Sequence, residues 1–92
     1  MNITFTAKDF EMTDAIREYA EKKAQRICKH AENIMYLDLT FSKTREECEV
    51  SAKFQIRNVQ HSYAVEKTTD MYKTIDRLVD KIIHIIHKDK DR

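Results

Sequence analysis

The stretch from Asp70 to Ile83, DMYKTIDRLVDKII, decides the fold that we predict for this chain. Its apolar residues recur at steps of three and four, a spacing that places them on one side of a helix. Thr69 or Asp70 can cap the start of that helix by accepting a hydrogen bond from a free backbone N–H. The apolar positions are Met71, Ile75, Leu78, Val79, Ile82, Ile85 and Ile86. Cationic residues stand between them, so one face can cover a core while another presents cations to a partner.

One strand and one helix are predicted at the start of the chain. Residues 2–8 alternate apolar and polar, as a half-buried strand does, with Ile3, Phe5 and Ala7 on one face. Thr13 is typical of a helix N-cap, and an acidic residue follows it in the first turn. Helical spacing then continues to about His30. The apolar row of this helix is Ile16, Tyr19, Ala20, Ala24 and Ile27.

Alternation returns in three later segments. Strands are predicted over residues 35–42, 48–57 and about 61–66, with a polar turn at 43–47 and a tight turn at 58–60. The expected apolar rows are Met35, Leu37, Leu39 and Phe41, then Cys48, Val50, Ala52, Phe54 and Ile56, and finally Tyr63 and Val65. Strands with one polar face favour an antiparallel meander that is open to water on one side.

The order of these elements predicts an α+β fold, β-α-β-β-β-α. Both helices should pack on one face of a four-stranded sheet, because the other sheet face is polar. The 92 residues suit a single domain with one modest core. The absence of Gly and Pro argues against flexible linkers and glycine-rich phosphate loops.

Composition narrows the class of protein. No apolar run is long enough to cross a bilayer, and the two cysteines are too sparse for a secreted disulfide scaffold. We therefore expect a cytoplasmic protein without a membrane partner. The net charge is only +1, but positive charge gathers in the two helical segments and negative charge gathers at Glu46, Glu47 and Glu49. This distribution indicates a basic side and an acidic tip, or else two solvated helix faces of mixed charge.

Metal and cofactor chemistry has weak support. His84 and His87 are three residues apart on a helix, and such a pair can in principle share a metal ion. A structural zinc site usually has four ligands, and Cys28 with His30 forms no convincing companion pair. We therefore predict no metal, no cofactor and no small-molecule substrate, with the histidines solvating the helix end or meeting phosphates.

Catalytic chemistry has equally little support. Cys28 lacks the surroundings of a nucleophile and is better interpreted as a small, half-buried residue. A capping role for Asp70 and ion pairing for Asp76 and Asp80 are favoured over acid–base catalysis. The chain is not expected to be an enzyme.

Basic residues are the remaining functional candidates. Lys22, Lys23, Arg26 and Lys29 recur at neighbouring helical positions in the first helix, and Arg77, Lys81, His84 and Lys88 do so in the second. If the helices lie side by side, these stripes would flank a groove suited to the phosphate oxygens of folded RNA. Lys53 and Arg57, on the polar sheet face, are weaker candidates. The alternative interpretation is that these basic residues bind no partner and only keep the domain soluble.

A resemblance to a known family rests on motifs that span the chain. Asp70-Met71-Tyr72-x-x-Ile75-Asp76-x-Leu78-x-Asp80-Lys81-Ile82, followed by His87-Lys88-Asp89-Lys90, resembles the second-helix signature of the ribosome hibernation promoting factor family. The Asn2-Ile3-Thr4 opening, the segment from Thr13 to Tyr19 and the strand end at Val65-Glu66 are also similar. One departure is Lys67-Thr68-Thr69, which stands where the family commonly has a glycine before the helix.

The resemblance implies both a fold and a function. The fold would be like that of double-stranded-RNA-binding domains. The function would be binding to the small ribosomal subunit in the mRNA and tRNA channel. There the protein would inhibit translation in stationary phase or stress by occlusion and promote ribosome dimers. Carried over by position, the rRNA-binding residues would be Lys22, Lys23, Arg26, Lys29, Arg77, Lys81, His84, His87, Lys88 and Lys90.

The short form of the family is the better match. Long members carry a C-terminal dimerisation domain, and the related ribosome-associated inhibitor has an extra tail; we expect neither, only a single ribosome-binding domain over residues 1–92. The partners would be the small subunit with its rRNA and whole ribosomes. A generic double-stranded-RNA-binding module, or a protein-interaction module that binds through its sheet, is the alternative.

Overall fold

The elements follow the predicted order. The computed structural model describes residues 2–31, 34–56 and 61–90. The elements are β1 (Asn2–Lys8), α1 (Asp14–His30), β2 (Ile34–Lys43), β3 (Cys48–Ile56), β4 (His61–Thr68) and α2 (Met71–Lys90). The predicted α+β class and β-α-β-β-β-α order are therefore confirmed. The predicted turn at 58–60, together with Arg57, lies outside the described residues.

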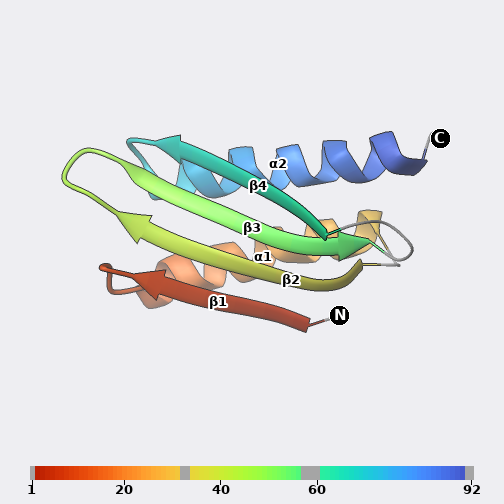
Figure 1. The fold of residues 1–92 in the computed structure, drawn as a ribbon. Helices are drawn as coiled ribbons and strands as arrows, with labels where there is room; N and C mark the ends of the chain where they lie inside the picture. Colours follow the sequence, from red (N-terminus) through yellow and green to blue (C-terminus); the bar gives the residue numbers. More distant parts are fainter. Residues whose placement is uncertain (1, 32–33, 57–60, 91–92) are drawn as a thin grey trace.

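The sheet is mixed, with the strand order β1-β2-β3-β4. β1 runs parallel to β2, whereas β2–β3 and β3–β4 are antiparallel, as the predicted meander requires. Parallel neighbours need a long crossover connection, and α1 supplies it between β1 and β2. Both helices consequently lie on the same face of the sheet, α1 and α2 next to each other (Figure 1).

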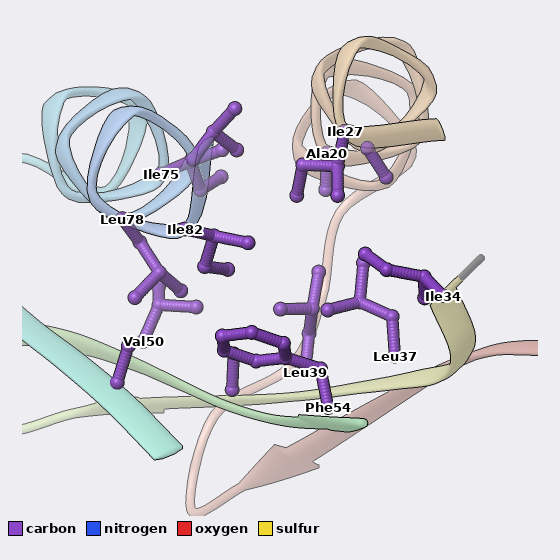
Figure 2. Close-up of a cluster of buried hydrophobic side chains, with 14 of the residues drawn as sticks. Ala20, Ile27, Ile34, Leu37, Leu39, Val50, Phe54, Ile75, Leu78 and Ile82 are labelled. Atoms are coloured by element: carbon purple, nitrogen blue, oxygen red, sulfur yellow. The ribbon is translucent and has the colours of Figure 1, made fainter. Parts of the chain in front are cut away.

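The core lies between this helical layer and the sheet. In Figure 2, side chains from both helices point toward inward-facing side chains of β2 and β3. Phe41, Phe54 and Ile82 are completely buried. The labelled core residues are Ala20, Ile27, Ile34, Leu37, Leu39, Val50, Phe54, Ile75, Leu78 and Ile82. Burying one such large apolar side chain is worth about 1.5–3 kcal/mol, so this layer sets where the helices sit.

The predicted apolar row of β2 was wrong at its first residue. Met35 is 56% exposed, and Ile34 is buried in its place. The cause is a shift in the β2–β3 register between Ile34 and Tyr36, which reverses the alternation at the start of the strand. The rest of the row, Leu37, Leu39 and Phe41, is buried as predicted.

Two edge positions also differ from a simple alternating pattern. Ala7, at the end of β1, is exposed although Ile3 and Phe5 pack partly against the core. Tyr63 and Val65 do share one face of β4, but it is the face open to water, because Ala64 is the residue that β4 buries. A small residue on β4 leaves room for α2 to approach the strand.

Local polar contacts define both helix starts. The Thr13 hydroxyl accepts a hydrogen bond from the Ile16 N–H at 3.2 Å, and the Asp70 carboxylate accepts one from the Tyr72 N–H at 2.9 Å. The predicted N-caps are therefore confirmed, with Asp70 rather than Thr69 as the cap of α2. The turn before α1 contains Asp9 at φ 54°, a left-handed conformation that Asp tolerates better than most residues.

Candidate nucleic-acid interface

One side of α1 faces α2 along a row of polar contacts, which we call the interhelical seam. It consists of Tyr19, Lys23, Arg26 and His30 on α1 with Tyr72, Asp76, Asp80 and His87 on α2. The α1 members are four, three and four residues apart, so they lie on one side of the helix. Their partners follow in the same chain order, which means that the two helices run in the same direction.

The seam is held by ion pairs and hydrogen bonds. Lys23 Nζ lies 3.3 Å from Asp76 Oδ1, and Arg26 Nη1 lies 3.7 Å from Asp80 Oδ1. The predicted ion pairing of these two aspartates is confirmed, with partners on the other helix. Such exposed pairs contribute at most about 1 kcal/mol each. Their main effect is to neutralise cations that would otherwise face a ligand.

Tyr19 connects the seam to the packing beneath it. Its hydroxyl donates to Asp76 Oδ1 at 2.6 Å, and its ring meets the Tyr72 ring edge to face at 5.0 Å. The hydrogen bond to Asp76, helped by burial and by the charges of Asp76 and Asp70, raises the pKa of Tyr19 to about 12. Asp76 is thus held by a hydroxyl donor and an ammonium group together.

Lys81 has a different environment from the rest of its predicted stripe. Its ammonium group lies 2.8 Å from the Glu66 carboxylate and donates to the Val65 carbonyl at 3.0 Å. Both partners belong to β4, so Lys81 ties α2 to the strand beside it. An unpaired strand edge invites association, and a lysine placed there discourages it.

Five of the predicted cations form the outward surface of the helical layer. They are Lys22, Lys29, Arg77, His84 and Lys88, and all five side chains are exposed. Lys22 and Lys29 are seven residues apart on α1, and Arg77, His84 and Lys88 follow steps of seven and four on α2. We call these five residues the outward cations. Lys73, which is also exposed and four residues before Arg77, was left out of the predicted site although its spacing fits.

The ten predicted residues therefore do not form two equal stripes. Lys23, Arg26 and His87 lie in the interhelical seam, Lys81 contacts β4, and five lie outward; the side chain of Lys90 is not described. Within the described residues, no ion pair involves Lys22, Lys29, Arg77 or Lys88. Their charge is therefore available to a polyanion.

The acidic tip lies away from this surface. Glu46 and Glu47 are exposed in the turn between β2 and β3, which projects at one end of the sheet (Figure 1). Glu49 follows in β3 and pairs with Lys67 at 3.4 Å. The charge of these three glutamates therefore lies at one end of the sheet, whereas the outward cations lie on the two helices.

The described residues offer no metal site and no membrane-spanning helix. Among the described residues there is no group of three or more His, Cys, Asp or Glu side chains that could hold a metal ion. Cys28 is half-buried, as predicted, and Cys48 is buried. In the described ranges, no helix has the length and apolar character needed to cross a membrane.

Comparison with known proteins decides the family. A family model described as "Sigma 54 modulation protein / S30EA ribosomal protein" matches residues 3–92. The chain belongs to this family. The sigma 54 modulation / S30EA family is one of ribosome-associated factors, not of known enzymes.

Curated relatives of this S30EA family chain carry one name. The ribosome hibernation promoting factor of Azotobacter vinelandii is 29% identical, over all of this chain and 85% of that protein. The protein of the same name from Escherichia coli strain K12 is 27% identical, over all of this chain and 96% of that protein.

Solved structures agree with the fold. A ribosomal subunit interface protein from Coxiella burnetii superposes with a TM-score of 0.90 at 29% identity, covering both chains completely. The N-terminal domain of Protein Y from Thermus thermophilus gives 0.84 at 26% identity, covering 96% of this chain and 98% of that one. Family membership thus supports a ribosome-associated role in hibernation for this S30EA family chain.

Proposed function

We propose that this protein is a hibernation factor that binds the small ribosomal subunit through its rRNA. It would occupy the channel for mRNA and tRNA, inhibit translation in stationary phase or stress by steric blockade, and promote ribosome dimers. Binding and exclusion suffice for such an activity, so no catalytic group is needed. A protein that acts on ribosomes in this way works in the cytoplasm.

The exposed cations on the helical layer are the observation that supports this proposal most directly. A rigid surface of spaced cations suits the phosphate backbone of folded RNA, where shape and backbone contacts dominate recognition. The proposed rRNA-binding set remains the ten residues predicted from the sequence. Within it, we assign the larger share to the outward cations, because acidic side chains already neutralise Lys23, Arg26 and Lys81.

The first experiment is co-sedimentation of the protein with purified ribosomes at several salt concentrations. Neutralising about six phosphates lowers the affinity by roughly a thousandfold between 50 and 200 mM salt. A salt-independent interaction would indicate a protein–protein contact instead. Plain RNA duplexes, added as competitor in excess, test the alternative of a generic double-stranded-RNA-binding module.

A charge reversal tests the surface itself. We expect Arg77→Glu combined with Lys88→Glu to abolish co-sedimentation and inhibition of translation in vitro, because repulsion replaces attraction at two phosphate contacts. Lys8→Glu with Lys43→Glu is the matched control: both lysines are exposed, lie on the strands and change the net charge equally. The proposed surface is wrong if both double variants lose binding equally or if neither does. Thermal melting establishes that each variant is folded.

A further inference from the structure

The two edges of the sheet are protected differently. At the β4 edge, Lys81 donates to the Val65 carbonyl, and a lysine placed there discourages a further strand from pairing. β1 forms the other edge, and among the described strands it pairs only with β2. Its register continues without a shift from Asn2 to Lys8, and Lys8 at its end is its one charged residue. β1 therefore presents a regular row of unpaired backbone N–H and C=O groups.

A groove lies beside this edge, between β1 and α1. It has a volume of about 210 Å³ and is lined by Ile3 and Phe5 from β1 and by Arg17, Glu21 and Gln25 from α1. The side chains of Ile3 and Phe5 are half-buried and pack partly against the core. An open strand edge with a groove that takes alternate side chains is the arrangement by which a sheet accepts an added strand.

Charged side chains of opposite sign stand on α1 beside the groove. Arg17 and Glu21 are exposed and lie about one helical turn apart. Within the described part of the chain, neither takes part in an ion pair. The guanidinium carbon of Arg17 lies 5.8 Å from the centre of the Phe5 ring. A row that carries one cation and one anion is complementary to the same row running in the opposite direction.

We propose that the β1 edge binds the β1 edge of a second copy of this chain, with the two strands antiparallel about a twofold axis at Thr4. An isologous contact of this kind is reciprocal, because each residue meets the same partner on the other copy. Ile3 of each copy then opposes Phe5 of the other. The two four-stranded sheets continue as one, with the helices of both copies on the same face.

The charges on α1 favour this register. α1 runs antiparallel to β1 (Figure 1), and four residues of helix advance about 6 Å, close to the advance of two residues of strand. Glu21 therefore lies beside Ile3, as Arg17 lies beside Phe5. With the axis at Thr4, Arg17 of each copy faces Glu21 of the other. An axis at Phe5 or at Ile3 would instead bring two arginines or two glutamates together.

Two further properties of the chain suit a second copy. The net charge of +1 leaves little repulsion between copies. Each copy also brings an apolar pair to the groove of the other, so both grooves are covered at once. Seven-residue edges make a small interface, so the association is weak and depends on the protein concentration. It requires neither RNA nor ribosomes, and its failure would leave the proposed function unaffected.

The first test is sedimentation velocity of the RNA-free protein over a wide range of concentrations. We expect the mass to rise from 11.0 kDa toward twice that value as the concentration increases. Alternate amides of β1 should gain protection from hydrogen exchange over the same range, because the added strand binds them. A mass of one chain at every concentration overturns the proposal.

Charge variants test the contacts across the edge. Arg17→Glu or Glu21→Arg alone should weaken association by roughly tenfold, because two exposed attractions become repulsions. An equimolar mixture of the two variants should recover wild-type association, since opposite charges then face each other. Lys53→Glu and Glu18→Arg are the matched controls, which change the net charge equally at exposed positions away from β1 and should associate normally, alone or mixed. A mixture that stays as weak as either variant overturns the proposal.

A cysteine at the axis tests the register directly. Opposed residues of antiparallel strands have Cα atoms about 4.5–5.5 Å apart, within the range of about 4.4–6.8 Å that a disulfide spans. Thr4→Cys should therefore give a disulfide-linked dimer on mild oxidation, seen on a non-reducing gel. Thr6→Cys, also exposed on β1, should not, because its counterpart lies about 13 Å away along the edge.

The two cysteine variants are controls for each other. Both retain Cys28 and Cys48, so the comparison accounts for cross-links through the native thiols. Thermal melting establishes that each variant is folded. Cross-linking through Thr6→Cys in place of Thr4→Cys, or through neither, overturns the proposal.

Discussion

At the scale of single residues, buried or half-buried hydroxyl groups form hydrogen bonds that hold the helices in place beneath the charged surface. The Tyr19 hydroxyl holds Asp76 from one side while the Lys23 ammonium group holds it from another. Thr74, completely buried, has its hydroxyl 2.7 Å from that of Thr68. Both tyrosine and threonine thus connect a helix to its neighbour through polar atoms rather than through apolar packing.

The raised pKa of Tyr19 predicts a loss of folding stability at alkaline pH. The folded state favours the protonated hydroxyl, because its hydrogen bond to Asp76 raises the pKa from 10.0 to about 12. The stabilisation is therefore complete below pH 10 and is lost as the pH rises toward 12. Absorbance titration at the tyrosinate band should show one ionisation near pH 12 that is absent from Tyr19→Phe. Circular dichroism over the same range shows whether the fold persists. If the ionisation that Tyr19→Phe removes lies near pH 10 instead, the hydrogen bond is contradicted.

The hydrogen bonds of the Thr74 hydroxyl predict that two conservative variants of this residue differ in their free energy of unfolding. Its hydroxyl lies 2.8 Å from the Asp70 carbonyl and 3.3 Å from the Cys48 carbonyl, so it joins the start of α2 to β3. Thr74→Val keeps the shape but removes the donor, and should cost about 1–3 kcal/mol in the free energy of unfolding. Thr74→Ser keeps the hydroxyl and should lose less. Equal losses, measured by urea unfolding, would show that packing alone matters at this position.

At the scale of elements, the start of β2 changes which side chain enters the core. A strict alternation from Met35 would bury that residue, but the register shift buries Ile34 instead. The shift occurs where the chain enters β2 after α1, at the end of the strand farthest from the β2–β3 turn. Alternation inside the strand is unaffected from Leu37 onward.

This register shift is tested by a pair of variants. Ile34→Ala should lower the free energy of unfolding by about 2–4 kcal/mol, because it leaves a cavity in the core. Met35→Lys should change it by no more than about 0.5 kcal/mol, since the side chain already lies in water. Chemical denaturation of both variants measures the two effects. The opposite ranking would mean that Met35 is the inward residue.

At the scale of the whole molecule, the sequence predicted most of the fold because its periodic patterns are long. The spacing from Met71 to Ile86 and the alternation from Cys48 to Ile56 each admit one arrangement of buried faces. The alternation in β4 did not, because its larger apolar residues lie on the face open to water. The order of elements then predicted a single sheet with both helices packed on one of its faces. The parallel pairing of β1 with β2 did not follow from any local pattern, since it depends on the path of α1 across the sheet.

The candidate site was less predictable. Helical spacing identified the cations, but it could not show that Lys23 and Arg26 meet aspartates of the other helix or that Lys81 meets β4. Those contacts depend on the rotation of each helix about its own axis, which tertiary packing sets. The meeting of His30 with His87 likewise required the helices to run in the same direction.

The most direct test of the central claim is a chemical footprint of the protein on the rRNA of the intact small subunit. We expect protection of backbone positions that line the mRNA and tRNA channel. The same positions should become reactive again when Arg77→Glu and Lys88→Glu are combined. Protection confined to sites outside the channel would contradict binding in the channel. Protection unchanged by the charge reversal would contradict binding through the outward cations.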